Sequence, residues 1–292
     1  MNTSILRRRS VLAAACTSAL LPLAAWSASA PDAIADYERV TGGRVGFFAR
    51  DLKSGRELSW RANERFAMCS TFKLSLAASV LALVDAGRET LARPVAFGRA
   101  DLLSYAPAAK ANVDRGSMTI EQLCEAAVVL SDNTCANLLL RETGGPGALT
   151  RFWRGIGDAV TRLDHNEPEL NRNRFGELQD TTTPAAMAGT VARLGTTNVL
   201  RPASRERLSG WMVACETGLR KLRAGLPAGW RVGDKTGNNG SDAVGDIAIA
   251  WPPQGNPVVI AAYVQGGKPT PQQQDALFSA LGALAGTQLR PA

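Results

Sequence analysis

Two patterns of hydrophobic and polar positions divide the chain. Runs rich in strand-forming residues, bounded by Gly, Asn and Pro, lie near both ends, and apolar residues at helical spacing occupy the region between them. The turn Lys53-Ser54-Gly55 predicts a hairpin between the first two runs. The predicted strands cover residues 44–52, 57–61, 230–235, 243–251 and 258–264.

The helical region and the two groups of strands together predict the architecture. Helices are predicted over residues 71–86, 119–130, 134–141, 146–156, 184–194 and 202–214, with a closing helix over residues 272–285. Strands from both ends can complete one sheet, so we expect an α+β protein with an all-α domain inserted into an α/β domain. The sheet would be five-stranded and antiparallel. The predicted sheet domain comprises residues 31–66 and 216–292, and the helical domain comprises residues 67–215.

Residues 162–180 fit neither pattern. The stretch is polar, has no sustained period and is too long for an ordinary connection. Pro168, together with Leu163, Leu170 and Phe175, offers apolar anchors that favour an ordered loop over a disordered one. We predict an Ω-type loop and expect it to carry functional residues.

The first thirty residues differ in character from the rest. Basic residues precede an apolar run over residues 11–25, and Ala28-Ser29-Ala30 has the pattern of a signal peptidase site. Arg8-Arg9-Ser10-Val11-Leu12 resembles a twin-arginine signal, so we predict export to the periplasm. The run is shorter than the ~20 residues of a spanning helix, and a lipid anchor on Cys16 has little support, so no stable membrane association is expected after cleavage.

The composition excludes several classes of function. With 45% hydrophobic and 20% charged residues, the chain has the balance of a globular protein. Removal of three signal arginines leaves 30 of the 33 basic residues against 26 acidic ones, a net charge of about +4, scattered in a way that disfavours nucleic-acid binding. His165 is the only histidine and no C-x-x-C occurs, so neither a metal nor another cofactor is expected. An oxidising compartment would permit disulfides, and the spacing leaves their pairing open among Cys69, Cys124, Cys135 and Cys215.

Ser70 and Lys73 lie at the start of a predicted helix that is apolar on nearly every side. Three residues apart, they project from one face, so the lysine amine can approach the serine hydroxyl and accept its proton. Desolvation would make that amine a better base, and the helix N-terminus would stabilise an oxyanion. The alternative is that Ser70 only caps the helix while Lys73 extends into solvent.

Two further motifs change the balance between these alternatives. Ser131-Asp132-Asn133 precedes a helix and Lys235-Thr236-Gly237 ends a strand, and each alone is typical of a helix cap or an edge strand. Together with Ser70-Thr71-Phe72-Lys73, they occur in the order that characterises class A β-lactamases and penicillin-binding proteins.

The chain resembles class A β-lactamases over essentially its whole length after the signal. Two more motifs carry the resemblance, Glu167-Pro168-Glu169-Leu170-Asn171 and Asp180-Thr181-Thr182-Thr183-Pro184. The resemblance implies the β-lactamase/transpeptidase-like fold with a site in the cleft between its domains. It also implies a monomer that hydrolyses the β-lactam amide of penicillins and cephalosporins and so gives antibiotic resistance.

The resemblance implies a role for each catalytic residue. Ser70 would be acylated, Lys73 would assist proton transfer, and Ser131 would relay a proton to the lactam nitrogen. Glu167 and Asn171, four residues apart, would hold and activate the water that hydrolyses the acyl-enzyme. Whether Lys73 or Glu167 takes the serine proton during acylation stays open.

The remaining matching residues would bind substrate. Asn133 would bind the substrate's side-chain amide, and Lys235 and Thr236, in the strand segment that includes Gly237, would hold its carboxylate. The backbone N–H groups of Ser70 and Asn238 would form the oxyanion hole. Tyr105 is predicted to line the entrance of the cleft as a stacking wall.

The chain departs from the family at His165, where relatives commonly place an arginine that pairs with an aspartate at the position of Asp180. A neutral histidine offers one hydrogen bond where arginine offers a charged fork, which puts the link in doubt. We therefore predict a looser or differently anchored loop, with Arg162 as a further anchor.

Two other departures concern the cleft. The strand after Gly240 has no arginine to support the substrate carboxylate, and among Arg220, Lys221 and Arg223 we predict that Lys221 takes this part. Cys69 precedes the nucleophile, but Asn239 stands where carbapenem-hydrolysing relatives have its partner cysteine. We expect Cys69 to pack as a small buried hydrophobic residue.

Three rival functions fit less well. A penicillin-binding D,D-peptidase would share the nucleophile motifs but need not have Glu167 and Asn171. A β-lactam sensor would stay acylated and would normally be tethered to a membrane-spanning segment. A Ser-His-Asp esterase would need His165 as its base, and its G-x-S-x-G motif is absent from the sequence.

Overall fold

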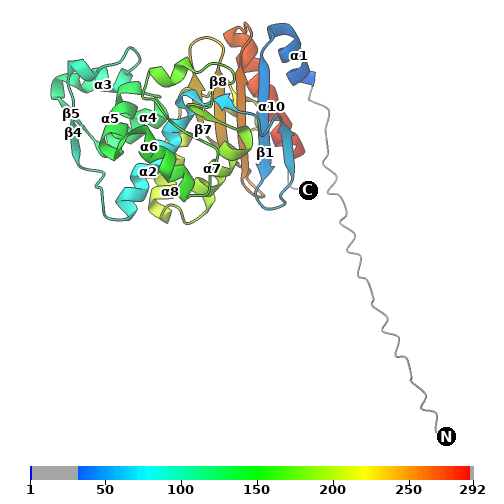
Figure 1. Cartoon of the computed structure of the whole chain (residues 1–292), viewed down its shortest axis with the longest axis horizontal. Helices are drawn as coiled ribbons and strands as arrows, with labels where there is room; N and C mark the ends of the chain where they lie inside the picture. Colours follow the sequence, from blue (N-terminus) through cyan, green and yellow to red (C-terminus); the bar gives the residue numbers. More distant parts are fainter. Residues whose placement is uncertain (2–31, 290–292) are drawn as a thin grey trace.

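The computed structural model describes Met1 and residues 32–289 (Figure 1). Apart from Met1, the predicted export signal lies outside the described residues. Within the described part, no helix combines the length and the apolar character needed to cross a bilayer.

A five-stranded sheet forms from both ends of the chain, as predicted. Its strands are β1 (Arg44–Asp51), β2 (Glu57–Trp60), β7 (Arg231–Asn238), β8 (Val244–Trp251) and β9 (Val258–Gln265). They pair antiparallel in the order β2-β1-β9-β8-β7, with β1 and β9 in register from Arg44↔Gln265 to Asp51↔Val258. The prediction ended β7 at Lys235, but the strand continues to Asn238, because its backbone stays paired with β8 up to Val244.

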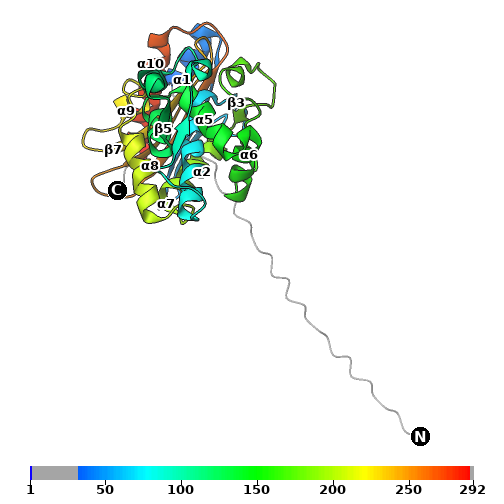
Figure 2. The same ribbon diagram turned by 90° about the vertical axis from the view of Figure 1, so that its left-hand side faces the viewer.

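Both faces of the sheet are buried, which explains the nearly continuous apolar run of β9. Its alternate residues Val258, Ile260, Ala262 and Val264 join a core with the helices α1 (Asp32–Thr41) and α10 (Pro271–Gln288). The intervening residues Val259, Ala261 and Tyr263 join a second core, beneath α7 (Pro184–Thr196) and a larger group of helices. Figures 1 and 2 show α1 and α10 on one side of the sheet and the larger group of helices on the other.

The helix α2 (Phe72–Asp85) is the centre of the helical region. It contacts α4 (Ile120–Val129), α5 (Asn133–Thr143), α6 (Gly145–Gly155) and α8 (Pro202–Val213). This all-round packing is the reason that its sequence is apolar on nearly every side. The predicted division into domains stays a prediction, and α7, which it assigns to the helical domain, packs on β1, β8 and β9 of the sheet.

Several short elements were not predicted, because they have too few residues for a periodic pattern. They are α3 (Pro107–Asn112), α9 (Leu222–Gly225) and the two-stranded pairs β3 (Phe66–Ala67) with β6 (Thr181–Thr182) and β4 (Pro94–Ala96) with β5 (Ser117–Thr119). The pair β3–β6 matters for the site. It joins the segment just before Ser70 to the end of the loop over residues 162–180, and Met68 N–H donates to the carbonyl of Asp180 at 3.1 Å.

The loop over residues 162–180 is ordered and contains the 3₁₀ turn Glu169–Arg172. Leu163 and Leu170 are buried anchors, as predicted. Phe175 was predicted as a third anchor, and this is wrong: its side chain is 73% exposed. The ring instead lies on the surface, where the guanidinium of Arg44 is 4.5 Å from the ring centroid.

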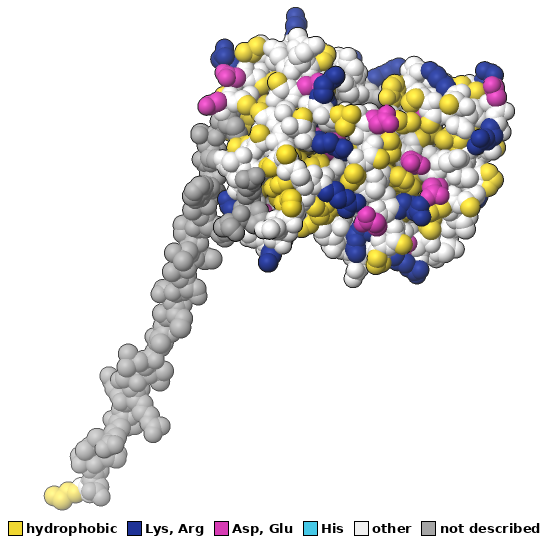
Figure 3. Space-filling model, turned by 180° about the vertical axis from the view of Figure 1, so that it is seen from behind, with side chains coloured by type: hydrophobic (Ala, Val, Ile, Leu, Met, Phe, Trp, Pro, Cys, Tyr) yellow, Lys and Arg dark blue, Asp and Glu magenta, His cyan; other side chains and the backbone are white. Residues whose placement is uncertain are grey.

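The surface shows no single dominant charge on the face drawn in Figure 3. Lys and Arg side chains are scattered there among Asp, Glu and apolar side chains. This distribution agrees with the scattered basic residues of the sequence.

Candidate active site

A cavity of about 690 Å³ lies where α2, α5 and the edge strand β7 meet. Nine of the twelve predicted site residues line it: Ser70, Tyr105, Ser131, Asn133, Asn171, Lys221, Thr236, Gly237 and Asn238. The other three, Lys73, Glu167 and Lys235, are buried and form hydrogen bonds or ion pairs with residues of the cavity wall. The structure therefore brings together all the residues that the motifs singled out.

Ser70 lies in the 3₁₀ turn Cys69–Thr71 that leads into α2. Thr71 holds this turn through its hydroxyl, which donates to the carbonyl of Met68 at 2.6 Å. On the other side, β7 approaches the turn closely. A Cβ at Gly237 would lie 2.9 Å from the amide nitrogen of Ser70, so the close approach requires glycine at this position.

Lys73 is fully buried beneath Ser70. Its Nζ lies 3.0 Å from Glu167 Oε1 and donates to the carbonyl of Ser131 at 2.9 Å and to Asn133 Oδ1 at 2.5 Å. Burial lowers the pKa of the Lys73 amine, although Glu167 opposes that shift. The side chain does not extend into solvent, so the structure contradicts the alternative in which Lys73 reaches outward.

Glu167 is held by contacts on every side. Its Oε1 accepts from the hydroxyl of Ser70 at 3.1 Å, and its Oε2 accepts from the amide of Asn171 at 2.6 Å. Asn137 fixes the backbone: its amide donates to the Glu167 carbonyl at 2.8 Å, and its Oδ1 accepts from the Glu167 N–H at 3.0 Å. Asn137 was not predicted as a site residue, although its position one turn after Asn133 on the same helix face was a usable signal.

Ser131 lies between two lysines. Its hydroxyl accepts from Lys235 Nζ at 3.0 Å while its carbonyl accepts from Lys73, and its backbone is left-handed at φ 59°. The predicted helix cap in this motif is the neighbouring Asp132, which accepts from Cys135 N–H at 2.9 Å and so begins α5. Asp132 therefore caps the helix, and Ser131, the residue before it, faces the cavity.

Thr236 forms part of the cavity wall along β7, and Lys235 is buried against the hydroxyl of Ser131. Burial lowers the pKa of Lys235 to about 8, which leaves it mostly protonated at neutral pH. Its Nζ also donates to the carbonyl of Thr236 at 2.7 Å. A cation and a hydroxyl side by side at one end of the cavity form a suitable site for a carboxylate.

Known proteins resemble this chain over nearly all of its length. The model of the Beta-lactamase enzyme family matches residues 30–289. The chain is 46% identical over 274 residues to Beta-lactamase L2 of Stenotrophomonas maltophilia, an alignment that covers 94% of this chain and 90% of that protein. It is 40% identical over 296 residues to a beta-lactamase of Streptomyces lavendulae, with 97% of each chain covered.

Solved structures agree with these relatives. The class A beta-lactamase of the last common ancestor of Gram-negative bacteria is 48% identical and superposes with a TM-score of 0.85 over 89% of this chain and 98% of that one. A beta-lactamase from Burkholderia vietnamiensis is 46% identical, with a TM-score of 0.85 over 88% and 95%. The chain belongs to the class A serine β-lactamases. It is therefore an enzyme that hydrolyses β-lactams, which confers resistance to them, and its α+β fold is that of the family.

The Lys221 side chain of this β-lactamase lines the cavity but is already paired. Its Nζ contacts Asp275 and lies 5.9 Å from the ring centroid of Phe278. Burial alone would raise the pKa of Asp275, but hydrogen bonds from Lys221 and Arg220 lower it. The predicted role of Lys221 toward the substrate carboxylate stays a prediction. In that role, the Lys221 ammonium group would contact the substrate carboxylate and the Asp275 carboxylate at the same time.

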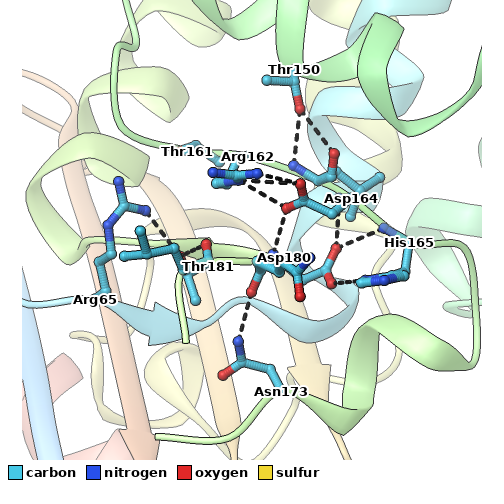
Figure 4. Close-up of polar contacts among 12 residues, drawn as sticks. Arg65, Thr150, Thr161, Arg162, Asp164, His165, Asn173, Asp180 and Thr181 are labelled. Carbon is cyan, nitrogen blue, oxygen red and sulfur yellow. Dashed lines mark hydrogen bonds and ion pairs between the residues drawn. The ribbon is translucent and has the colours of Figure 1, made fainter. Parts of the chain in front are cut away.

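We call the contacts that join the two ends of the loop, made by Arg162, Asp164, His165 and Asp180, the neck (Figure 4). Asp180 Oδ1 accepts from the N–H groups of Asp164 at 2.7 Å and His165 at 3.0 Å, and Asp180 Oδ2 lies 2.6 Å from His165 Nδ1. The hydrogen bond to Asp180 raises the pKa of His165.

The contacts of the neck show whether His165 keeps the link to Asp180, which the sequence left in doubt. The link is present, because the imidazole reaches the carboxylate. Arg162 takes part as predicted: its Nε donates to Asp164 Oδ2 at 2.9 Å, and that oxygen accepts from Asp180 N–H at 3.0 Å. Whether the loop is looser than in relatives stays a prediction.

The four cysteines of the described residues are unpaired and buried. Cys69 is inaccessible to solvent, as predicted, and burial raises the pKa of its thiol. The amide oxygen of Asn239, at the position where a partner cysteine would lie, accepts from the N–H groups of Ser241, Asp242 and Ala243 and shapes the turn after β7. Among residues 32–289, no group of three or more His, Cys, Asp or Glu is arranged to hold a metal ion.

Proposed function

We propose that this β-lactamase hydrolyses penicillins and cephalosporins through an acyl-enzyme on Ser70, which is hydrolysed by a water that Glu167 activates. One observation carries the proposal: Glu167 Oε1 lies 3.1 Å from the Ser70 hydroxyl and 3.0 Å from Lys73 Nζ, in a place closed to solvent. A nucleophile hydrogen-bonded to a carboxylate that is itself paired with a buried lysine matches the geometry expected for covalent catalysis.

In the acylation step, the Ser70 proton passes to Lys73 or Glu167 while Oγ bonds to the lactam carbonyl carbon. The N–H groups of Ser70 and Asn238 would stabilise the resulting oxyanion. When the C–N bond breaks, the lactam nitrogen takes the proton of Ser131. The proton taken from Ser70 then returns to Ser131, whose hydroxyl accepts a hydrogen bond from Lys235 at 3.0 Å.

In the deacylation step, Glu167 takes a proton from water, and the oxygen of that water attacks the acyl carbon. The Ser70 ester bond then breaks, and the serine oxygen recovers a proton. Asn171 supports this step because its amide holds Glu167 Oε2 at 2.6 Å and leaves Oε1 toward Ser70. This second half of the reaction is what separates a β-lactamase from a D,D-peptidase or a sensor that stays acylated.

The remaining residues of the cavity would orient the substrate. Lys235 and Thr236 would bind its carboxylate, with Lys221 in support, and Asn133 would bind its side-chain amide. Tyr105 is exposed at the rim of the cavity, which suits a stacking wall. We further propose that the enzyme acts as a monomer in the periplasm after its signal is removed.

The main experiment mixes the purified enzyme with a chromogenic cephalosporin and follows turnover. Glu167→Gln should lower kcat about 10²- to 10⁴-fold, because it removes a general base, and intact-mass spectrometry should show an acyl adduct on Ser70. Ser70→Ala provides the control, since it should bind substrate without forming an adduct. An inactive wild-type enzyme, or a Glu167→Gln enzyme with no adduct, would overturn the proposal.

Lys221 has its own test. Lys221→Met should raise KM while kcat changes little, because the carboxylate contact persists from bound substrate to transition state. Arg220→Met is the matched control, since Arg220 lines the same cavity and contacts the same Asp275. An unchanged KM in Lys221→Met would remove Lys221 from the site.

A further inference from the structure

Three side chains next to the proposed carboxylate site form a row of hydrogen bonds that the reaction above does not use. Cys215 Sγ lies 3.3 Å from Thr217 Oγ1, and Thr217 Oγ1 lies 2.6 Å from Thr236 Oγ1. Thr217 and Thr236 line the cavity beside Ser131, whereas Cys215 is 1% exposed behind them. The row joins the segment after α8 to the edge strand β7.

Each member of this row has one proton, so a row in which every member donates to the next can run in two directions. Burial raises the pKa of the Cys215 thiol, which therefore keeps its proton at neutral pH. In one direction, Thr236 donates to Thr217, Thr217 donates to sulfur, and no proton of the row faces the cavity. In the other direction, the thiol donates to Thr217 and Thr217 donates to Thr236.

A bound carboxylate selects the second direction. A carboxylate can only accept hydrogen bonds, so Thr236 must donate its single proton to the carboxylate and must accept from elsewhere. Thr217 is positioned to supply that hydrogen bond at 2.6 Å. The first direction is also the poorer one in the empty cavity, because it ends on sulfur, which is a weak acceptor.

We propose that Thr217 is a positioning residue that directs the hydroxyl proton of Thr236 toward the substrate carboxylate. This inference rests on the proposed function, in which Thr236 binds that carboxylate. Thr217 does not take part in bond making or breaking. It holds the Thr236 hydroxyl in the donating orientation before substrate arrives, and its own hydrogen bond polarises that hydroxyl.

The test compares two substitutions that separate hydrogen bonding from packing. Thr217→Val keeps the shape of the side chain but removes the hydroxyl, whereas Thr217→Ser keeps the hydroxyl but removes a methyl group. We expect Thr217→Val to raise KM for a cephalosporin about 3- to 10-fold with kcat nearly unchanged, and Thr217→Ser to stay within about twofold of wild type. A packing role alone predicts the opposite order, and that order would overturn the inference.

Two further measurements distinguish failure of this inference from failure of the proposed function. Thr236→Val should raise KM; if it does not, the proposed carboxylate site is wrong. If Thr236→Val raises KM and Thr217→Val does not, the carboxylate site stands and the role of Thr217 is refuted. With the methyl ester of the same cephalosporin, the effect of Thr217→Val should disappear, and an equal rise in KM would mean that Thr217 acts only through structure.

Discussion

The active-site cleft and the neck of the loop both depend on paired ionisable side chains, but they differ in their exposure to water. The side chains of Lys73 and Glu167 are 0% exposed, whereas His165 is 44% exposed and its partner Asp180 is 3% exposed. When a buried ion pair loses one member, the remaining charge has neither a partner nor water to stabilise it. At the surface, water can take the place of the lost partner. Substitutions in the cleft should therefore affect chemistry strongly, whereas those in the neck should act on stability, weakly where only the exposed charged contact is lost.

The largest difference in kcat/KM between the cleft and the neck should appear when one cationic side chain is removed from each. Lys73→Met should lower kcat/KM about 10³-fold, because the amine that pairs with Glu167 and is proposed to take part in proton transfer is lost. Arg162→Met removes a partly exposed cation from the neck and should leave kcat/KM within about threefold. Steady-state and single-turnover kinetics would measure both. Similar losses in the two variants would contradict the distinction between cleft and neck.

The next effect concerns Asn137, which holds the backbone of Glu167. Asn137→Ala should lower kcat about 10- to 100-fold, because a small displacement of the general base is costly. It should also lower the free energy of unfolding by about 1–3 kcal/mol, since two backbone groups lose their partners. Arg141→Ala, on the same helix, is the control and should change neither quantity appreciably. Urea unfolding and burst kinetics would check the prediction, which fails if kcat is unchanged.

Within the neck, Asp180 should matter more through its hydrogen bonds than through its charge. Asp180→Ala removes the acceptor of two backbone N–H groups and should lower the free energy of unfolding by about 2–3 kcal/mol. Asp180→Asn keeps one oxygen for those groups and loses only the charged contact with His165, so about 1 kcal/mol is expected. Equal losses in the two variants, measured by urea unfolding, would argue that charge dominates.

The smallest effect is the pH dependence of the contact between His165 and Asp180. The pKa of His165 is raised above its ordinary value of 6.5, so its stabilising contribution is complete below that value and fades as pH rises through the raised pKa. Because the side chain is half exposed, we expect at most about 1 kcal/mol between the two limits. The measurement is the free energy of unfolding against pH for wild type and His165→Gln.

His165→Arg completes that comparison, because arginine stays charged across the same pH range. It should abolish the pH-dependent difference from His165→Gln and slow hydrogen exchange over residues 162–180. Parallel pH curves for wild type and His165→Gln, together with unchanged exchange in His165→Arg, would show that the neck does not respond to the charge of His165.

Much of the fold and of the candidate site was accessible from the sequence, because those features depend on local patterns. Alternation and turn residues predicted all five strands of the sheet, and the all-round apolar character of residues 71–86 predicted a buried helix. The motifs around Ser70, Ser131, Glu167 and Lys235 could be recognised because the reaction demands particular functional groups at fixed spacings. Those groups either line one cavity or lie buried against the residues of its wall.

The partners of those groups were decided only by the tertiary structure. Asn137 meets Glu167 across 30 positions of the chain, and Thr217 meets Thr236 across 19. Such contacts depend on how helices and strands pack, and many residue types are compatible with the local pattern at each position. The same holds for His165, whose single hydrogen bond put the link to Asp180 in doubt until the contact itself was seen. Sequence indicated which groups are available for the proposed chemistry, and packing decided what holds them in place, because orientation depends on contacts between distant segments.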